Sequence, residues 1–159
     1  MPDFRNLNEL SEYMKKKVLP TAIKKVGNTV KDKLKDRIDK DVYSFSPSQY
    51  ERTYQLRESV VVKSSEIKKD EITVEIGHDY DLINAIPPNK HVSVADQSDV
   101  SYWTGYWINF GQVGGIFGQG FWTKPRPYMD NTKKEIKKEN TLKKELKKNL
   151  KKMNINTSD

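Results

Sequence analysis

The sequence contains no cysteine and only two histidines among its 159 residues. We therefore expect no disulfide, no thiol nucleophile and no thiolate metal site. Long hydrophobic runs are also missing, because the longest uninterrupted ones span three residues, whereas a membrane span needs roughly 20. The first residues carry an acid and no apolar stretch of signal-peptide length, so we expect a soluble protein with neither a secretory signal nor a membrane segment.

Charge is abundant instead, at 32% of residues where roughly 25% is usual, and it is unevenly placed. The net charge of +7 comes from one segment, Lys133–Lys152, which holds ten lysines and three glutamates, while the rest of the chain balances to zero. The basic character therefore belongs to one segment and not to the whole fold. Its lysines have three interpretations: a solvated helix face, contacts with nucleic-acid phosphates, or docking on an acidic protein ring.

Apolar residues recur every three or four positions from Leu7 to Asp41, which predicts a long amphipathic helix. Asn6 and Glu9 have the spacing of a capping box at its start, and Pro20 predicts a kink or a break. At 1.5 Å per residue such a helix would be about 50 Å long, so we expect part of it to meet another chain. The apolar positions are Leu10, Met14, Val18, Ala22, Val26, Val30, Leu34 and Ile38.

A second helix is predicted from near Tyr128 to about Met153, with residues 133–153 forming its lysine-rich part. Its apolar stripe is thin and needs a groove or a partner to hold it. We expect residues 154–159 to form a disordered tail. The stripe consists of Ile136, Leu142, Leu146, Leu150 and Met153.

Two short stretches alternate apolar and polar residues, which predicts half-buried strands joined by a hairpin turn at Lys68–Glu71. We expect their apolar residues and Leu56 to pack on the inner face of the first helix, at Val26, Val30 and Leu34. The strand residues in question are Val60, Val62, Ile72, Val74 and Ile76.

Half of the 16 aromatic residues lie between Tyr102 and Trp122. A period of two would place Tyr102, Tyr106, Ile108 and Phe110 on one strand face, whereas a helical period would align Trp103, Trp107 and Phe110; the pattern leaves both open. Residues 83–99 have the composition of a long loop. Five of the eight glycines follow in 111–120, which favours a mobile loop that becomes ordered in an assembly.

Three arrangements could be drawn as chemical sites, and each lacks an essential part. His78, Asp79 and Asp81, with His91 elsewhere, are a poor metal-ligand set. Ser59 could join His78 and Asp81 in a triad, but no nucleophile-elbow glycines surround any serine. The glycine-rich segment lacks the Gly-Lys-Ser/Thr ending of a phosphate loop. We therefore expect no catalytic residue, no metal and no cofactor, and we predict that the protein is not an enzyme.

Three segments carry a resemblance to a known family. The segment Tyr50-Glu-Arg-Thr-Tyr-Gln-Leu-Arg-Glu-Ser-Val60 resembles the "Tyr-x-Arg-Thr-x-x-Leu-x-x-Ser" pattern of the small neck and tail-completion proteins of long-tailed bacteriophages, also called head-tail joining or minor capsid proteins. Residues 102–111 are similar to the family's "Tyr-Ala-x-x-x-Glu-Phe-Gly", and residues 125–129 to its "Ala-Arg-Pro-Phe-Leu". The sequence departs from the pattern at Gly105, where Ala is usual, and at Asn109, where Glu is common.

The resemblance implies a single α+β domain over residues 1–153, with the long N-terminal helix and the C-terminal helix packed on a small antiparallel sheet. It implies a homo-oligomeric ring, expected to be a hexamer, between the tail tube protein and a head-side connector or stopper protein, with DNA passing transiently and non-specifically through the lumen. The expected location is the virion, at the neck or the head-proximal end of the tail, after assembly in the host cytoplasm. The family contributes no catalytic residues.

We assign nine residues to interfaces on this basis. Arg52 and Arg57 could pair across subunits or form ordinary surface salt bridges. The alternative function is a nucleic-acid-binding protein that uses the lysine-rich C-terminal helix. The predicted interface residues are Arg52, Arg57, Trp103, Trp107, Asn109, Phe110, Gly111, Arg126 and Tyr128.

Overall fold

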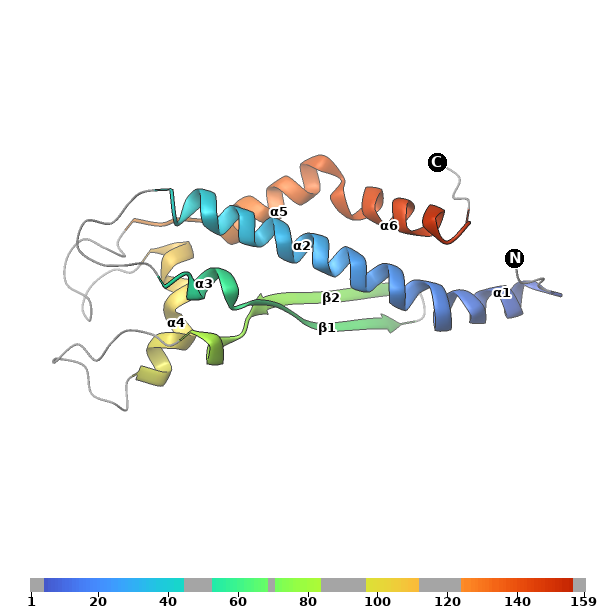
Figure 1. The fold of residues 1–159 in the computed structure, drawn as a ribbon, viewed down its shortest axis with the longest axis horizontal. Coiled ribbons are helices and arrows are strands. Elements are labelled where there is room, and N and C mark those ends of the chain that lie inside the picture. Colours follow the sequence, from blue (N-terminus) through green and yellow to red (C-terminus); the bar gives the residue numbers. More distant parts are fainter. Residues whose placement is uncertain (1–4, 45–52, 69–70, 84–96, 112–123, 156–159) are drawn as a thin grey trace. The chain divides into compact units, whose positions relative to one another are not determined.

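The protein has an α+β fold, which confirms the predicted class. The computed structural model describes residues 5–44, 53–68, 71–83, 97–111 and 124–155. They form helices and one two-stranded antiparallel sheet (Figure 1). Among these residues no helix is both long enough and apolar enough to cross a membrane.

The chain divides into two compact units. Unit 1 comprises Met1–Asp32, Val62–Ile76 and Glu135–Asp159, and unit 2 comprises Lys33–Val61 and Gly77–Lys134. Each unit is therefore assembled from segments that are distant in the sequence.

The N-terminal helix is built from three consecutive pieces: α1 (Leu7–Tyr13), the π-helix η1 (Met14–Val18) and α2 (Leu19–Asp41). The predicted N-cap is confirmed, because the side chain of Asn6 accepts a hydrogen bond from the N–H of Glu9 at 2.9 Å. The irregularity predicted at Pro20 is present as a π turn just before it, where the N–H of Leu19 donates to the carbonyl of Met14. Proline removes a backbone donor and crowds the preceding turn, and the wider turn accommodates this.

The predicted hairpin is confirmed as β1 (Val60–Lys68) and β2 (Glu71–His78). Helix α2 meets it at Gly27, where a Cβ atom would lie 3.2 Å from Cγ1 of Val74 and 3.5 Å from both γ-carbons of Val62. The packing of Val62 and Val74 on the helix is therefore confirmed. Ile72 was expected in the same core, but it is 41% exposed, because it lies one residue inside the hairpin end of β2.

The C-terminal segment forms two helices, α5 (Tyr128–Glu139) and α6 (Thr141–Lys152), so the prediction of one continuous helix is wrong. The break is at Asn140, whose φ of 51° and ψ of 38° are left-handed; asparagine tolerates this conformation better than most residues. After α6, the N–H groups of Asn154 and Ile155 donate to carbonyls of its last turns. The remaining residues of the predicted tail lie outside the described part.

Unit 2 contains α3 (Gln55–Glu58), the 3-10 helix η2 (Tyr80–Leu82) and α4 (Gln97–Phe110). The aromatic segment is therefore helical, and the loop predicted over 83–99 already gives way to helix at Gln97. The predicted burial of Leu34, Leu56 and Val60 is confirmed. Other buried apolar residues of this unit are Ile38, Val42, Ile83, Ile108 and Tyr128.

Candidate functional site

Three side chains from distant parts of the sequence form a buried hydrogen-bond network, here called the His78 network. Nδ1 of His78 lies 2.7 Å from Oγ of Ser59, and Nε2 lies 2.8 Å from the hydroxyl of Tyr128. Ser59 also donates to the carbonyl of Leu56 at 2.8 Å, and Tyr128 donates to that of Gly105 at 3.3 Å. The network thereby joins the end of α3, the end of β2, the middle of α4 and the start of α5.

Burial determines what this network can do. Ser59 is fully buried and His78 is almost so, which keeps the serine hydroxyl away from any solute. Nε2 of His78, the ring nitrogen that does not contact Ser59, is hydrogen-bonded to the hydroxyl of Tyr128. Asp81 lies exposed on η2, and its backbone N–H donates to the side chain of Asp79. The arrangement therefore serves to fix helices and a strand to one another.

The departure at Gly105 has a physical reason in this network. A Cβ atom there would lie 3.1 Å from the hydroxyl of Tyr128 and 3.2 Å from Cδ2 of His78. A side chain there would press on both rings, which would have to shift by a few tenths of an ångström, and glycine avoids this. Ser59, Gly105 and Tyr128 each belong to a different one of the three segments that carry the family resemblance, so these segments meet at His78.

Asn109 lies inside the protomer, with a side chain only 1% exposed. Its Oδ1 accepts a hydrogen bond from the N–H of Met129 at 2.9 Å, which supplies a partner to a free donor in the first turn of α5. Its Nδ2 is buried without a partner among the residues that the structure describes. Asn109 and Tyr128, both assigned to interfaces from the sequence, thus contact other parts of the same chain.

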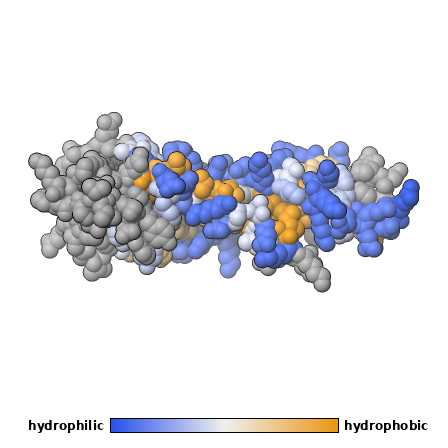
Figure 2. Space-filling view, turned by 90° about the horizontal axis from the view of Figure 1, so that it is seen from below, coloured by the Kyte–Doolittle hydropathy of each residue, from blue (hydrophilic) through white to orange (hydrophobic). Residues whose placement is uncertain are grey.

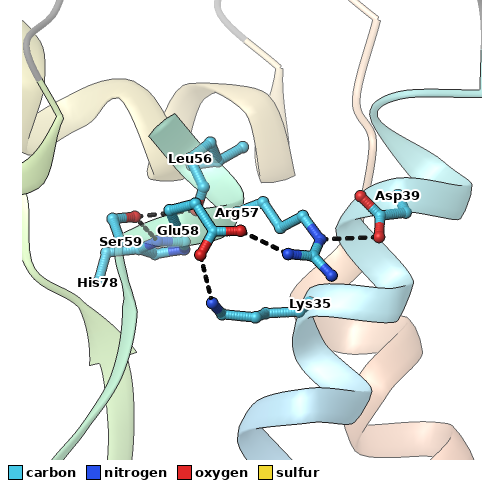
Figure 3. A network of polar contacts seen from close by, with 7 residues as sticks. All are labelled: Lys35, Asp39, Leu56, Arg57, Glu58, Ser59 and His78. Carbon is cyan, nitrogen blue, oxygen red and sulfur yellow. Dashed lines mark hydrogen bonds and ion pairs between the residues drawn. The ribbon is translucent and has the colours of Figure 1, made fainter. Parts of the chain in front are cut away.

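Arg57 lies in a network of charged side chains at the edge of unit 2 (Figure 3). Its Nε is 2.8 Å from Oδ2 of Asp39, and its NH1 contacts Glu58. Glu58 is also 2.8 Å from Nζ of Lys35, and the hydrogen bonds from Lys35 and then Arg57 lower the pKa of Glu58. Arg57 thus forms ion pairs within the protomer, and its pairing across subunits stays a prediction.

The other predicted interface residues have varied positions. Trp107 is half-buried, and Arg126 donates its N–H to the carbonyl of Ile108 at 2.8 Å. Gly111 ends α4 with a φ of 78°, a conformation that favours glycine. Arg52 and the side chain of Trp103 lie outside the described residues, as does the glycine-rich segment after Gly111.

An exposed aromatic pair occupies the last turns of α4. Tyr106 and Phe110 are each 51% exposed, and their ring centroids are 4.7 Å apart. The i, i+4 spacing on a helix brings them together. Phe110 was predicted as an interface residue from the sequence, but Tyr106 was not, because a helical period was taken to align Phe110 with Trp103 and Trp107. The i, i+4 spacing of Tyr106 and Phe110 in the sequence could have indicated this pair.

Other exposed large apolar side chains, such as Leu7, Ile72 and Leu142, lie on other elements. Figure 2 shows one face on which polar side chains cover most of the coloured surface and apolar ones reach it in small groups. Within the described ranges, no group of three or more His, Asp or Glu side chains is arranged to hold a metal ion. The exposed aromatic pair is therefore the candidate site, and its chemistry suits contact with another protein.

Fold and surface together define an α+β protein with buried structural polar contacts and an exposed aromatic helix face. The family model of YomN matches residues 6–152, and the chain belongs to this family. YomN is a protein of a Bacillus prophage and the family is phage-derived, which supports a phage protein in general but not tail completion specifically. No curated protein and no solved structure gives a significant match.

Proposed function

We propose that this chain is a structural protein of the phage neck or tail end. In this proposal it forms a ring, expected to be a hexamer, that joins the tail tube to a head-side connector or stopper protein and lets DNA pass. Membership of a phage-derived family supports the phage context. The three segments similar to tail-completion proteins support the more specific role.

The observation that carries the proposal is the exposure of Tyr106 and Phe110. Two aromatic rings in contact, each about half in water, leave apolar surface uncovered that a second protein can bury. Burial of apolar area contributes roughly 25 cal/mol per Å², and aromatic residues are the usual anchors of interfaces. The helix η2 contacts α4, and its residue Leu82 is exposed as well.

The test is a double substitution, Tyr106→Ser with Phe110→Ser, compared with the wild type by analytical ultracentrifugation. We expect the oligomer to dissociate at protein concentrations that leave the wild type assembled, while the circular dichroism spectrum stays nearly the same. Ile72→Ser, at an exposed apolar position on β2, is the matched control and should assemble normally. An unchanged oligomer in the double variant would contradict the proposed interface.

A further inference from the structure

Helix α1 is an amphipathic helix without a covered face. None of its residues is buried, and its apolar side chains include Leu7, which is 82% exposed, and Leu10, which is 37% exposed. About two turns beyond Leu10, the same side of the helix enters the core of unit 1, where Val18 and Ala22 are buried. The apolar stripe of the N-terminal helix is thus covered in its later part and open at its start.

The π turn keeps the two parts of the stripe in line. A π-helical turn takes in one residue more than an α-helical turn, which delays the rotation of the following helix by about 100°. Val18 and Ala22 therefore stay on the side that carries Leu10 and Met14. Because the stripe is continuous, its exposed part on α1 carries apolar side chains of the kind that are buried further along the helix.

Helix α6 has a second apolar stripe that is open at one end. Leu150, near its C-terminus, is buried, whereas Leu142, in its first turn, is 50% exposed. Leu146 lies between them and is half-buried. Since Leu7 and Leu142 are both exposed in the same protomer, the two open ends do not cover each other within one chain.

Charge decides which pairing of open ends between two copies is favourable. Helix α1 carries two glutamates and no basic residue, whereas α6 carries six lysines and one glutamate. Pairing α6 with α6 would bring lysines together, and pairing α1 with α1 would bring Glu9 and Glu12 together, both at a cost. Pairing α1 with α6 brings glutamate near lysine instead. Glu12 already lies 2.9 Å from Nζ of Lys16 in the next turn, so Glu9, nearer to Leu7, is the carboxylate best placed to meet the α6 lysines.

We propose that α1 of one copy docks on the Leu142 end of α6 of a second copy, with Leu7 and Leu10 against Leu142 and with the α1 glutamates near the α6 lysines. This inference rests on the proposed function, because it supposes that the chain assembles with itself. The contact is head-to-tail, since each copy offers α1 to one neighbour and α6 to the other. Head-to-tail contacts generate closed rings when the rotation between copies closes.

The absence of native cysteine allows a direct test by cross-linking. Leu7→Cys and Leu142→Cys are prepared as separate full-length proteins, mixed in equal amounts and treated with a short bismaleimide reagent. We expect a covalent dimer in the mixture at severalfold the yield of either protein alone. Leu7→Cys mixed with Ile72→Cys, which is also exposed, is the matched control and should give only background cross-linking.

The outcomes separate this inference from the proposed function. A wild type that assembles, combined with a Leu7–Leu142 yield no higher than the Leu7–Ile72 control, overturns the docking of α1 on α6 and leaves the ring intact. Efficient cross-linking of Leu7→Cys with itself shows α1 pairing with α1 and also overturns it. A wild type that stays monomeric at all concentrations overturns both.

Discussion

The hydroxyl of Tyr128 lies 2.8 Å from Nε2 of His78 in the interior of unit 2. The phenol and the imidazole are in edge-to-face contact, with ring centroids 5.9 Å apart, and burial raises the pKa of Tyr128, so the phenol stays protonated and able to donate. Through this pair, the segment that starts α5 is tied to the end of β2. The segments similar to phage tail-completion proteins are therefore held together by polar contacts inside the protomer.

Removing the hydroxyl of Tyr128 should destabilise the protomer. Tyr128→Phe keeps the ring but removes the hydrogen-bond partner at Nε2 of His78 and the additional donor to the carbonyl of Gly105, so we expect a loss of about 1–3 kcal/mol in the free energy of unfolding. Urea unfolding followed by circular dichroism measures it. Tyr54→Phe, at an exposed tyrosine, is the control and should change stability by less than about 0.5 kcal/mol. Equal stability of both variants would contradict a stabilising role of the His78 network.

Placing a charge at Val74 should disrupt the contact between β2 and α2. Val74→Asp puts a carboxylate into the close contact between β2 and Gly27 of α2, and we expect a loss of at least about 2 kcal/mol. Ile72→Asp tests the same face of β2 at an exposed position and should cost far less. Thermal unfolding of the two variants checks the order. A larger loss for Ile72→Asp would show that the packing of the hairpin is misassigned.

The ion pairs of Glu58 predict a small dependence of stability on pH. Lys35 and Arg57 lower the pKa of Glu58 in the folded chain, so the carboxylate stabilises the folded chain above about pH 4.3, the ordinary glutamate value, and this contribution is lost as the pH falls through the lowered value. The site is solvent-exposed, so we expect Glu58→Gln to cost at most about 1 kcal/mol at pH 7. The difference between wild type and variant should vanish in acid. A difference that grows in acid would reverse the assigned sign.

The lysines of α6 should contribute little to the stability of the protomer. Replacing Lys143, Lys144, Lys151 and Lys152, all exposed, by Gln should change the free energy of unfolding by less than about 0.5 kcal/mol. Duplex DNA binding should be weak and unspecific in both proteins, and filter binding at several salt concentrations measures it. If α6 instead binds DNA phosphates, the slope of log affinity against log salt concentration will be flatter in the variant by roughly 0.9 for each lost contact. That outcome favours the alternative function of a nucleic-acid-binding protein.

The regular elements with long periodic patterns could be predicted from the sequence, and the exceptions have physical causes. The helix over Leu7–Asp41 and the hairpin follow from repeats of apolar residues. The break at Asn140 was missed although the sequence carries a trace of it: the lysine pairs recur every four residues on each side, but six residues separate Lys137 from Lys143 and Ile136 from Leu142. The aromatic segment fitted both periods, so its periodicity alone could not decide, and in the structure it is a helix that buries Gly105 and Ile108.

The candidate site was predicted less completely than the fold. The motif residues were recognised as important, but Tyr128 and Asn109 were assigned to interfaces, whereas the structure buries both within the protomer. Their partners are distant in the sequence, since His78 is 50 residues from Tyr128, and spacing alone does not reveal such contacts. Phe110 was identified from its aromatic surroundings, and its pairing with Tyr106 became visible only once the segment was known to be helical.

Native mass spectrometry of the full chain over a range of protein concentrations shows whether the chain assembles into a ring. We expect a single closed oligomer, a hexamer or close to it, which loses subunits when Tyr106 and Phe110 are replaced by serine. A chain that remains monomeric at every concentration, and that binds duplex DNA tightly near physiological salt, would show that the protein is not a ring protein of the phage neck.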